Sequence, residues 1–209
     1  MSARKTQLGL SDLKFGVIIL AAGRSSRMGR PKLLLSWGKI SVVEHLVQQW
    51  RKVGASQIAI VRAVADLDLE RTCADVPSII NPAPERGMFS SIQCAAHWPN
   101  WNPTLRHWVI ALGDQPHLHD TTLQQLVDLA RQHPDDICQP ARGGRARHPV
   151  VLPEAVFHRI PASGAGNLKE FLSSVPETRR NIDIDDPGLD LDIDTPEDYE
   201  RAKRLAGLP

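Results

Sequence analysis

Runs of consecutive apolar residues alternate along most of the chain with segments in which apolar residues recur every three or four positions. The runs predict buried strands and the spaced pattern predicts amphipathic helices. Strands are expected at 15–20, 57–61, 77–80, 107–112, 148–152 and 180–185, and helices at 42–53, 89–97, 120–132, 166–175 and 196–205. This order predicts an α/β domain of Rossmann-like type, with three layers and a mostly parallel central sheet.

Three of the predicted helices carry start or stop signals. Ser41 and Glu44 match a capping box before the helix at 42–53, and Gly54 is placed to end it. Asp120 is predicted to cap the helix at 120–132. Thr195 is predicted to cap the last helix, where a proline occupies the first helical position.

The composition narrows the class of protein. A length of 209 residues suits one domain, so we expect a flexible tail at 1–13 and a single domain at 14–209. The net charge of +1 gives no overall attraction to nucleic acid or to a membrane. No apolar run approaches ~18 residues and no signal peptide is visible. The three scattered cysteines predict neither a disulfide framework nor a zinc site, and favour free thiols in the cytoplasm.

The segment that follows the first predicted strand, LAAGRSSRMGRPK at 20–32, is rich in glycine and in cationic side chains. Backbone N–H groups near glycines can point at an anion, and guanidinium and ammonium groups supply charge. A Walker loop is excluded because Gly23 and Gly29 are too far apart and Arg30 follows the second glycine. A dinucleotide fingerprint is excluded because 21–23 holds one glycine and Pro31 prevents an early helix. We predict a long loop that wraps a polyphosphate; the alternative is a solvated basic loop.

Aspartates follow later predicted strands. Asp114 comes after the strand at 107–112, and the carboxyl ends of parallel strands share one edge of the sheet, so Asp114 is expected near the 20–32 loop. A carboxylate beside a triphosphate requires a cation between them, and Mg²⁺ is commonly held by one or two carboxylates plus phosphates. Asp190, Asp192 and Asp194 alternate with apolar residues, which in a strand places them on one face. Asp114 and Asp194 are therefore the predicted Mg²⁺ ligands, Asp192 is left open, Asp190 is predicted to be solvated surface, and a turn or cap role remains the alternative for Asp114.

Two further groups of residues are interpreted as structural. His117 and His119 could imitate a metal pair beside Asp114, but they precede the predicted helix cap and are expected to be exposed loop residues. Trp98 and Trp101 are expected to pack against their own domain rather than to mark a subunit contact.

The 20–32 loop resembles the signature of nucleotidyltransferases related to molybdopterin cytidylyltransferase and molybdopterin guanylyltransferase, which reads LAAG or LAGG followed by x-S-x-R-M-G-x-P-K. Further matches occur in the order of the family and extend the resemblance over about residues 15 to 206. These matches are Asn81-Pro82, Gly87-Met88 with Ser90-Ser91, Gly113-Asp114-Gln115-Pro116, His148-Pro149-Val150 and 192–198.

The resemblance implies Mg²⁺-dependent transfer of a nucleoside monophosphate from a nucleoside triphosphate to a phosphorylated acceptor, with release of pyrophosphate. The implied nucleotide-binding residues are Leu20, Ala21, Ala22, Gly23, Arg24, Lys32, Asn81, Gly87 and Ser91. The implied catalytic residues are Arg24, Arg27, Lys32 and Asp114. Cytidylyltransferases of this family tend to carry LAAG, so Ala22 favours CTP over GTP.

The acceptor half matches the family less well. Arg147 replaces a glycine usual before His-Pro, and a later Gly-Asp-x-Gly stretch is absent. Arg145, Arg147 and His148 are the expected acceptor-binding residues, and the arginines favour an acceptor that carries phosphate. The resemblance implies molybdopterin or its molybdenum form as acceptor, and a molybdoenzyme or cofactor-insertion protein as partner. Transfer to a sugar phosphate and a non-catalytic nucleotide or cofactor carrier are the alternatives.

Overall fold

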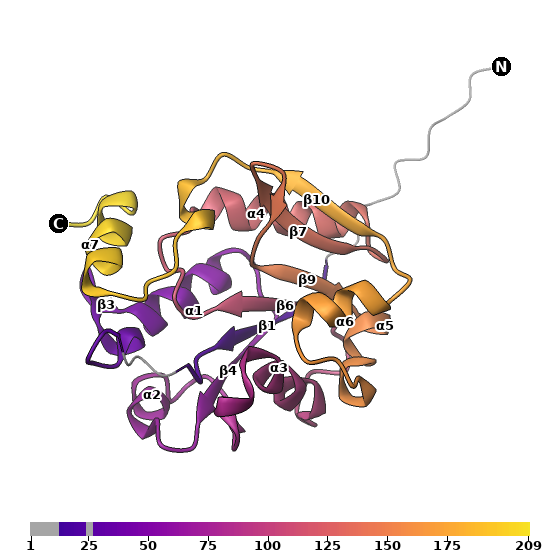
Figure 1. Cartoon of the computed structure of the whole chain (residues 1–209), viewed down its shortest axis with the longest axis horizontal. Helices are drawn as coiled ribbons and strands as arrows, with labels where there is room; N and C mark the ends of the chain where they lie inside the picture. Colours follow the sequence, from indigo (N-terminus) through magenta and orange to yellow (C-terminus); the bar gives the residue numbers. More distant parts are fainter. Residues whose placement is uncertain (1–12, 24–26) are drawn as a thin grey trace.

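An eight-stranded sheet forms the centre of the structure, a computed structural model that describes residues 13–23 and 27–209 (Figure 1). Its strand order is β10-β7-β9-β6-β1-β4-β5, and β8 pairs with β7 outside this path. The strands are β1 (Phe15–Leu20), β4 (Gln57–Ala63), β5 (Ser78–Asn81), β6 (His107–Leu112), β7 (Ile137–Arg142), β8 (Arg145–Ala146), β9 (Val150–Pro153) and β10 (Arg179–Asp183). Only β9 and β8 pair antiparallel with their neighbours in this sheet.

Helices cover both faces of the sheet, and each face has its own apolar core (Figure 1). One core involves α1 (Val42–Lys52), α4 (Asp120–Gln132) and α7 (Pro196–Leu205). The other involves α3 (Met88–His97), α5 (Glu154–Phe157) and α6 (Leu168–Ser174). Successive strand residues point to opposite faces, so Val17 and Ile19 of β1 join the first core and Ile18 joins the second. The predicted three-layer α/β fold with a mostly parallel sheet is confirmed.

Shorter elements connect these layers. They are the hairpin β2 (Ser36–Trp37) and β3 (Ile40–Ser41), the helix α2 (Leu67–Thr72), and the 3₁₀ turns η1 (Lys32–Leu34), η2 (Pro84–Arg86), η3 (Ile160–Ala162) and η4 (Pro187–Asp190). In the part of the chain that the structure covers, no helix has both the length and the apolar character that crossing a bilayer requires.

Capping residues in the sequence correctly predicted several helix boundaries. The Ser41–Glu44 capping box starts α1, the left-handed Gly54 follows its end, and Thr195 caps α7. The prediction for α4 was wrong in one respect, because Asp120 lies inside the helix and His119 is its N-cap. The side chain of His119 does not cap the helix. Instead, the buried carboxylate of Asp186, far along the chain, accepts hydrogen bonds at this helix end from the His119 backbone N–H and from Thr122 Oγ1.

Trp101 packs against its own domain, as expected. Its ring makes edge-to-face contacts with Trp98, Trp108 and Phe157, and its indole N–H donates to the Ala95 carbonyl. The cysteines are free thiols, with Cys73 and Cys138 buried and Cys94 partly buried.

Candidate active site

The carboxyl ends of β1, β4, β5 and β6 open on three adjoining hollows of about 240, 640 and 300 Å³. Gly23, just beyond β1, lines all three hollows. Lys32 and Asp114 line the first, Asn81 lines the second, and Asp114 returns in the third. The loop that leaves β1 is therefore the common wall of the cleft, where ligands of open α/β sheets are expected.

Backbone contacts hold the start of this loop against the ends of β4 and β6. Ala21 N–H donates to the Val61 carbonyl at 2.8 Å, and Gly113 N–H donates to the Leu20 carbonyl at 3.0 Å. A Cβ atom at position 113 would lie 2.7 Å from the Leu20 oxygen, which is closer than non-bonded atoms can approach. Glycine is thus required at 113, and its close approach sets the following Asp114 beside the loop.

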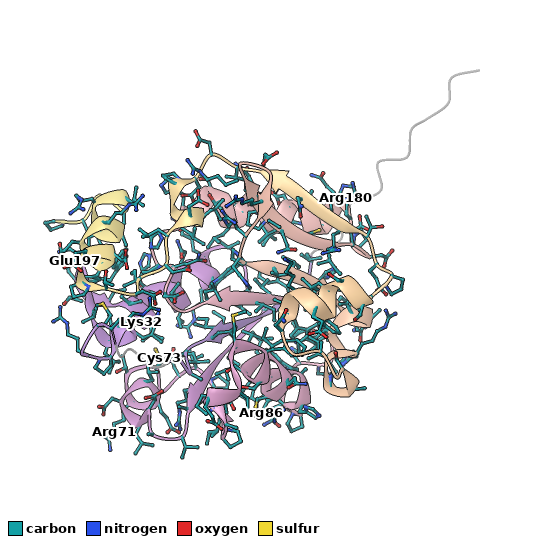
Figure 2. The ribbon with its side chains drawn as sticks, viewed as in Figure 1. Lys32, Arg71, Cys73, Arg86, Arg180 and Glu197 are labelled. Carbon is teal, nitrogen blue, oxygen red and sulfur yellow. The ribbon has the colours of Figure 1, made fainter. Side chains whose placement is uncertain are left out.

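Lys32 is the centre of a cluster of charges in the cleft. Its ammonium donates to Asp114 Oδ2 at 2.6 Å and to the Ile193 carbonyl at 3.1 Å, and it lies 3.5 Å from Asp194 Oδ1. Arg27 lies 2.8 Å from the other oxygen of Asp194, Oδ2. Figure 2 shows Lys32 where the segment leading into α7 passes the loop after β1. Residues from three distant parts of the sequence therefore meet here, as the sequence predicted.

Asp194 reaches the cluster by a route that the sequence did not predict. The alternating segment at 190–194 is not a strand: η4 ends at Asp190, and residues 191–194 follow without strand pairing. The apolar members of the pattern are nevertheless buried, Leu191 and Ile193 in the core with α1 and α4. Ile193 N–H donates to the Asp114 carbonyl at 3.1 Å, so one backbone hydrogen bond holds the two aspartates beside each other.

The donor set fits a magnesium ion. Asp114 Oδ1 is buried and has no hydrogen-bond partner, so it is an acceptor that lacks a donor. The pKa of Asp192 is raised, mainly by desolvation and to a smaller extent by the nearby carboxylates of Asp114 and Asp194. Asp192 Oδ1 accepts a hydrogen bond from Gln115 Nε2 at 3.0 Å. Within the described ranges, no three His, Cys, Asp or Glu side chains form a ready-made metal site. Mg²⁺ does not require one, because substrate phosphates and waters complete its shell.

The third hollow collects the residues predicted to contact the nucleotide. Leu20, Ala22, Gly87 and Ser91 all line it. Gly87 has a left-handed backbone with φ of 90° just before α3, which explains the glycine there.

Asn81 is placed differently from these residues, because its side chain is turned into the protein. It donates to the hydroxyls of Ser90 and Ser91 at 2.9 Å each and accepts from the Ala83 N–H. Its side chain therefore shapes the wall of the cleft between β5 and α3.

The predicted acceptor residues are only partly brought together. Arg147 Nη2 lies 2.6 Å from Asp190 Oδ1, and Arg142 pairs with the other oxygen of Asp190. Asp190 is exposed at the surface, as predicted, but it also pairs with both arginines, which lower the pKa of its carboxyl group. Arg145 is exposed on β8. Neither Arg145 nor Arg147 lines the three hollows.

His148 does not line the three hollows either. Burial lowers the pKa of this histidine, while the backbone of Ile110 and the carboxylate of Asp114 act in the opposite direction.

The prediction for His117 was wrong, whereas that for His119 was right. His117 is buried, and its Nε2 lies 3.0 Å from the Leu191 carbonyl and 3.1 Å from that of Gly188. It thereby ties the Asp114 turn to η4, a tertiary contact with no local sequence signal. The His119 side chain is 47% exposed, as expected for a loop residue.

One wall of the cleft was missed from the sequence. The loop after β4 contributes Val64, Ala65 and Asp66 to the second hollow. Buried Arg62 holds this loop by donating to the carbonyls of Ala63 and Val64, and it pairs with Glu70 on α2. The position of β4 could have indicated this wall, because β4 runs parallel to β1 and ends at the same edge of the sheet. The predicted Arg24 belongs to 24–26, which together with 1–12 of the expected tail lies outside the described residues.

Comparison with known proteins gives relatives that cover most of the chain. It is 26% identical to the molybdenum cofactor cytidylyltransferase of Escherichia coli over 89% of this chain and 94% of the relative. It is 29% identical to a molybdenum cofactor guanylyltransferase of Rhizobium johnstonii over 80% and 72% of the two chains.

A solved structure, Rv0371c from Mycobacterium tuberculosis, superposes with a TM-score of 0.76 at 25% identity over 91% and 97% of the two chains. A manganese complex of Rv0371c superposes with a TM-score of 0.70 at 23% identity over 90% and 97% of the chains.

The family model described as MobA-like NTP transferase domain matches residues 17–179, which include the loop after β1, Asp114 and His148. The relatives are named for nucleotidyl transfer, and in this chain the lysine and the aspartates stand together beside the glycine-bearing loop at the sheet edge. The chain belongs to the MobA-like NTP transferase family and is a nucleotidyltransferase.

Proposed function

We propose that this nucleotidyltransferase transfers cytidine monophosphate from CTP to the phosphate of molybdopterin or of the molybdenum cofactor, with Mg²⁺ as the metal. The observation that carries the proposal is the cluster of Lys32 with Asp114 and Asp194 beside the loop that leaves β1. This cluster supplies, at one point, a cation for a triphosphate and two carboxylates for a divalent ion.

In the proposed reaction, an oxygen of the acceptor phosphate forms a bond to the α-phosphorus of CTP. The bond between that phosphorus and the bridging oxygen breaks in line, and pyrophosphate leaves with the bonding electron pair. Phosphoryl and nucleotidyl transfer depend mainly on positioning and charge neutralisation, so no protein nucleophile is needed. Mg²⁺ held by Asp114 and Asp194 would neutralise phosphate charge, while Lys32 and Arg27 would stabilise the charge that accumulates on pyrophosphate.

The preference for CTP rests on Ala22. This residue is 7% exposed and lines the second and third hollows, so its methyl group narrows the space available to a base. One methyl group discriminates by on the order of 1 kcal/mol. Relatives of both base specificities match the chain, which makes a direct comparison of CTP with GTP the relevant measurement.

The proposed acceptor site lies toward β7 and β8. His148, which follows β8, is one candidate, and Arg145 and Arg147 supply cationic groups for an acceptor phosphate. Arg147 would have to share or leave Asp190 in order to bind such a phosphate, because its guanidinium is engaged in this structure.

The test is pyrophosphate release by the purified chain with Mg²⁺, CTP or GTP, and molybdopterin or molybdenum cofactor as acceptor. The proposal expects acceptor-dependent release that is faster with CTP than with GTP. Binding of nucleotide without release under any of these conditions would favour a carrier instead. Release only with an unrelated sugar phosphate would keep the reaction class and overturn the acceptor.

A further inference from the structure

The proposed metal ligands are already engaged by cations of the chain itself. Asp114 Oδ2 accepts from Lys32 at 2.6 Å. Asp194 has Lys32 at 3.5 Å from one oxygen and Arg27 at 2.8 Å from the other. Both oxygens of Asp194 therefore face a positive charge, whereas Asp114 keeps one oxygen, Oδ1, that is buried without a partner.

A divalent cation entering this arrangement meets two opposing effects. It must replace a protein cation at an Asp194 oxygen, since Mg²⁺ binds carboxylate oxygen at about 2.0–2.1 Å and leaves no room for a guanidinium on the same lone pairs. It is also repelled by the ammonium of Lys32, whose side chain is only 14% exposed and cannot move into solvent easily. Arg27, with 69% of its side chain exposed, is the more movable cation.

We propose that Arg27 and Lys32 are resident counterions that keep the affinity of the free protein for the metal low, and that the triphosphate opens the metal site by drawing these cations onto its own oxygens. This inference rests on the proposed function, because it takes a triphosphate as the ligand of the loop after β1. The metal and the nucleotide then bind with positive coupling, and each raises the affinity for the other by the same factor.

The two aspartates play unequal parts in this exchange. Asp114 offers Oδ1 to a metal without losing Lys32, so it is available before the nucleotide arrives. Asp194 becomes available only when Arg27 leaves it. Removing the Arg27 charge should therefore improve metal binding in the absence of nucleotide, and the improvement should pass through Asp194.

The experiment titrates the full chain with Mn²⁺ as the metal probe, without nucleotide, and follows the electron paramagnetic resonance signal of free Mn²⁺. Arg27→Gln is expected to bind Mn²⁺ about three- to tenfold more tightly than the wild type. The double variant Arg27→Gln/Asp194→Asn should lose this gain. Arg204→Gln removes an exposed cation from the last turn of α7 and serves as the matched control, with unchanged Mn²⁺ affinity. Lys32→Gln, a second variant at the same site, should also tighten Mn²⁺ binding.

A second arm measures the affinity for CTP with and without Mn²⁺, in the absence of acceptor. The ratio of the two affinities should be smaller in Arg27→Gln than in the wild type. Unchanged or weaker Mn²⁺ binding by both Arg27→Gln and Lys32→Gln overturns the inference, and so does a gain that persists in the double variant. If no nucleoside triphosphate binds the wild type, the proposed function fails. If CTP binds with metal but the variants do not tighten Mn²⁺ binding, only this inference fails.

Discussion

At the scale of single residues, the cleft depends on a few side chains whose neighbours leave them little freedom. Lys32 has Asp114, Asp194 and the Ile193 carbonyl within reach of one ammonium group. Gly113 allows the backbone of β6 to approach that of β1. The sequence indicated Lys32 and Asp114 as candidate site residues, because each lies in a short local motif. It could not predict their ion pair, which depends on how the loop and the sheet edge meet.

Lys32→Ala is expected to lower kcat for pyrophosphate release by about 10²- to 10³-fold, because in the proposed mechanism it removes a cation that stabilises charge developing on the leaving group. Steady-state kinetics with CTP and Mg²⁺ measure the effect, and circular dichroism checks the fold. Lys39→Ala, at an exposed lysine between β2 and β3, is the matched control and should leave kcat unchanged. Turnover by the Lys32 variant at the wild-type rate would remove this residue from the mechanism.

Gly113→Ala is expected to lower the free energy of unfolding by about 1–3 kcal/mol, because the new Cβ would press on the Leu20 carbonyl and on Leu33. Urea denaturation measures the change. Gly164→Ala adds the same methyl group where nothing lies within 4 Å, and it should change stability far less. Equal effects of the two substitutions would contradict the close approach at 113.

At the scale of elements, segments with their own start, stop and periodicity signals were predicted closely. β6 and α7 have the predicted bounds, and α1 begins at its capping box. β7 was missed because its sequence, ICQPAR, mixes polar residues and proline into a strand that is buried on both faces. The short α2 was missed as well, since six residues carry too little periodicity to be distinguished from a turn.

The loop between β4 and α2 gives the prediction at this scale. Arg62→Met removes the guanidinium that holds the Ala63 and Val64 carbonyls, while a side chain of similar length still fills the buried space. The KM for CTP should rise about tenfold because the wall of the cleft is no longer held in place. Stability should change little, because the carboxylate of Glu70 that loses its partner is 52% exposed and can be solvated by water.

Kinetics at varied CTP and at varied acceptor separate this positioning role from a general structural one. The KM for the acceptor should stay at the wild-type value in the Arg62 variant. Arg71→Met, at an exposed arginine on α2 that pairs with Asp68, is the control for charge removal. A parallel rise of both KM values, with a loss of thermal stability, would show that Arg62 acts on the fold as a whole.

At the scale of the whole molecule, the layer arrangement and the ligand edge followed from the order of elements alone. The connections made by η4 did not, because they join segments that are distant in sequence. Buried His117 contacts Gly188 in η4, and Asp186, the N-cap of η4, accepts a hydrogen bond from Thr122 of α4; no local sequence signal indicates either contact. The placement of the predicted acceptor residues was also hard to foresee, because Arg147 pairs with Asp190 from that same segment.

Burial of the thiols gives a prediction that reports on the whole fold. Burial raises the pKa of Cys73 to about 11 and that of Cys138 to about 12, against a usual value of 9.0. The neutral thiols therefore stabilise the folded state fully below pH 9, and this contribution is lost as the pH rises through 11 and 12. At pH 8, an aromatic disulfide reagent should modify partly buried Cys94 first, and Cys73 and Cys138 only at the rate of unfolding.

Mass spectrometry of the labelled peptides distinguishes the three sites, and labelling in concentrated urea gives the reference rate for each thiol. Labelling of Cys138 as fast as Cys94 in the native protein would contradict the packing of β7 described above.

The division of β1 between two apolar cores has a mechanical consequence. Val17 and Ile19 pack into the core on one face of the sheet, and Ile18 packs into the core on the other. β1 is therefore fixed to the helices of both layers. Neither layer can melt without loosening it, and local opening should reach it last. The loop that we propose as the triphosphate site begins directly at the end of this strand. Because the strand before the loop is already rigid, binding of a flexible triphosphate would cost conformational entropy mainly in the ligand and little in the protein.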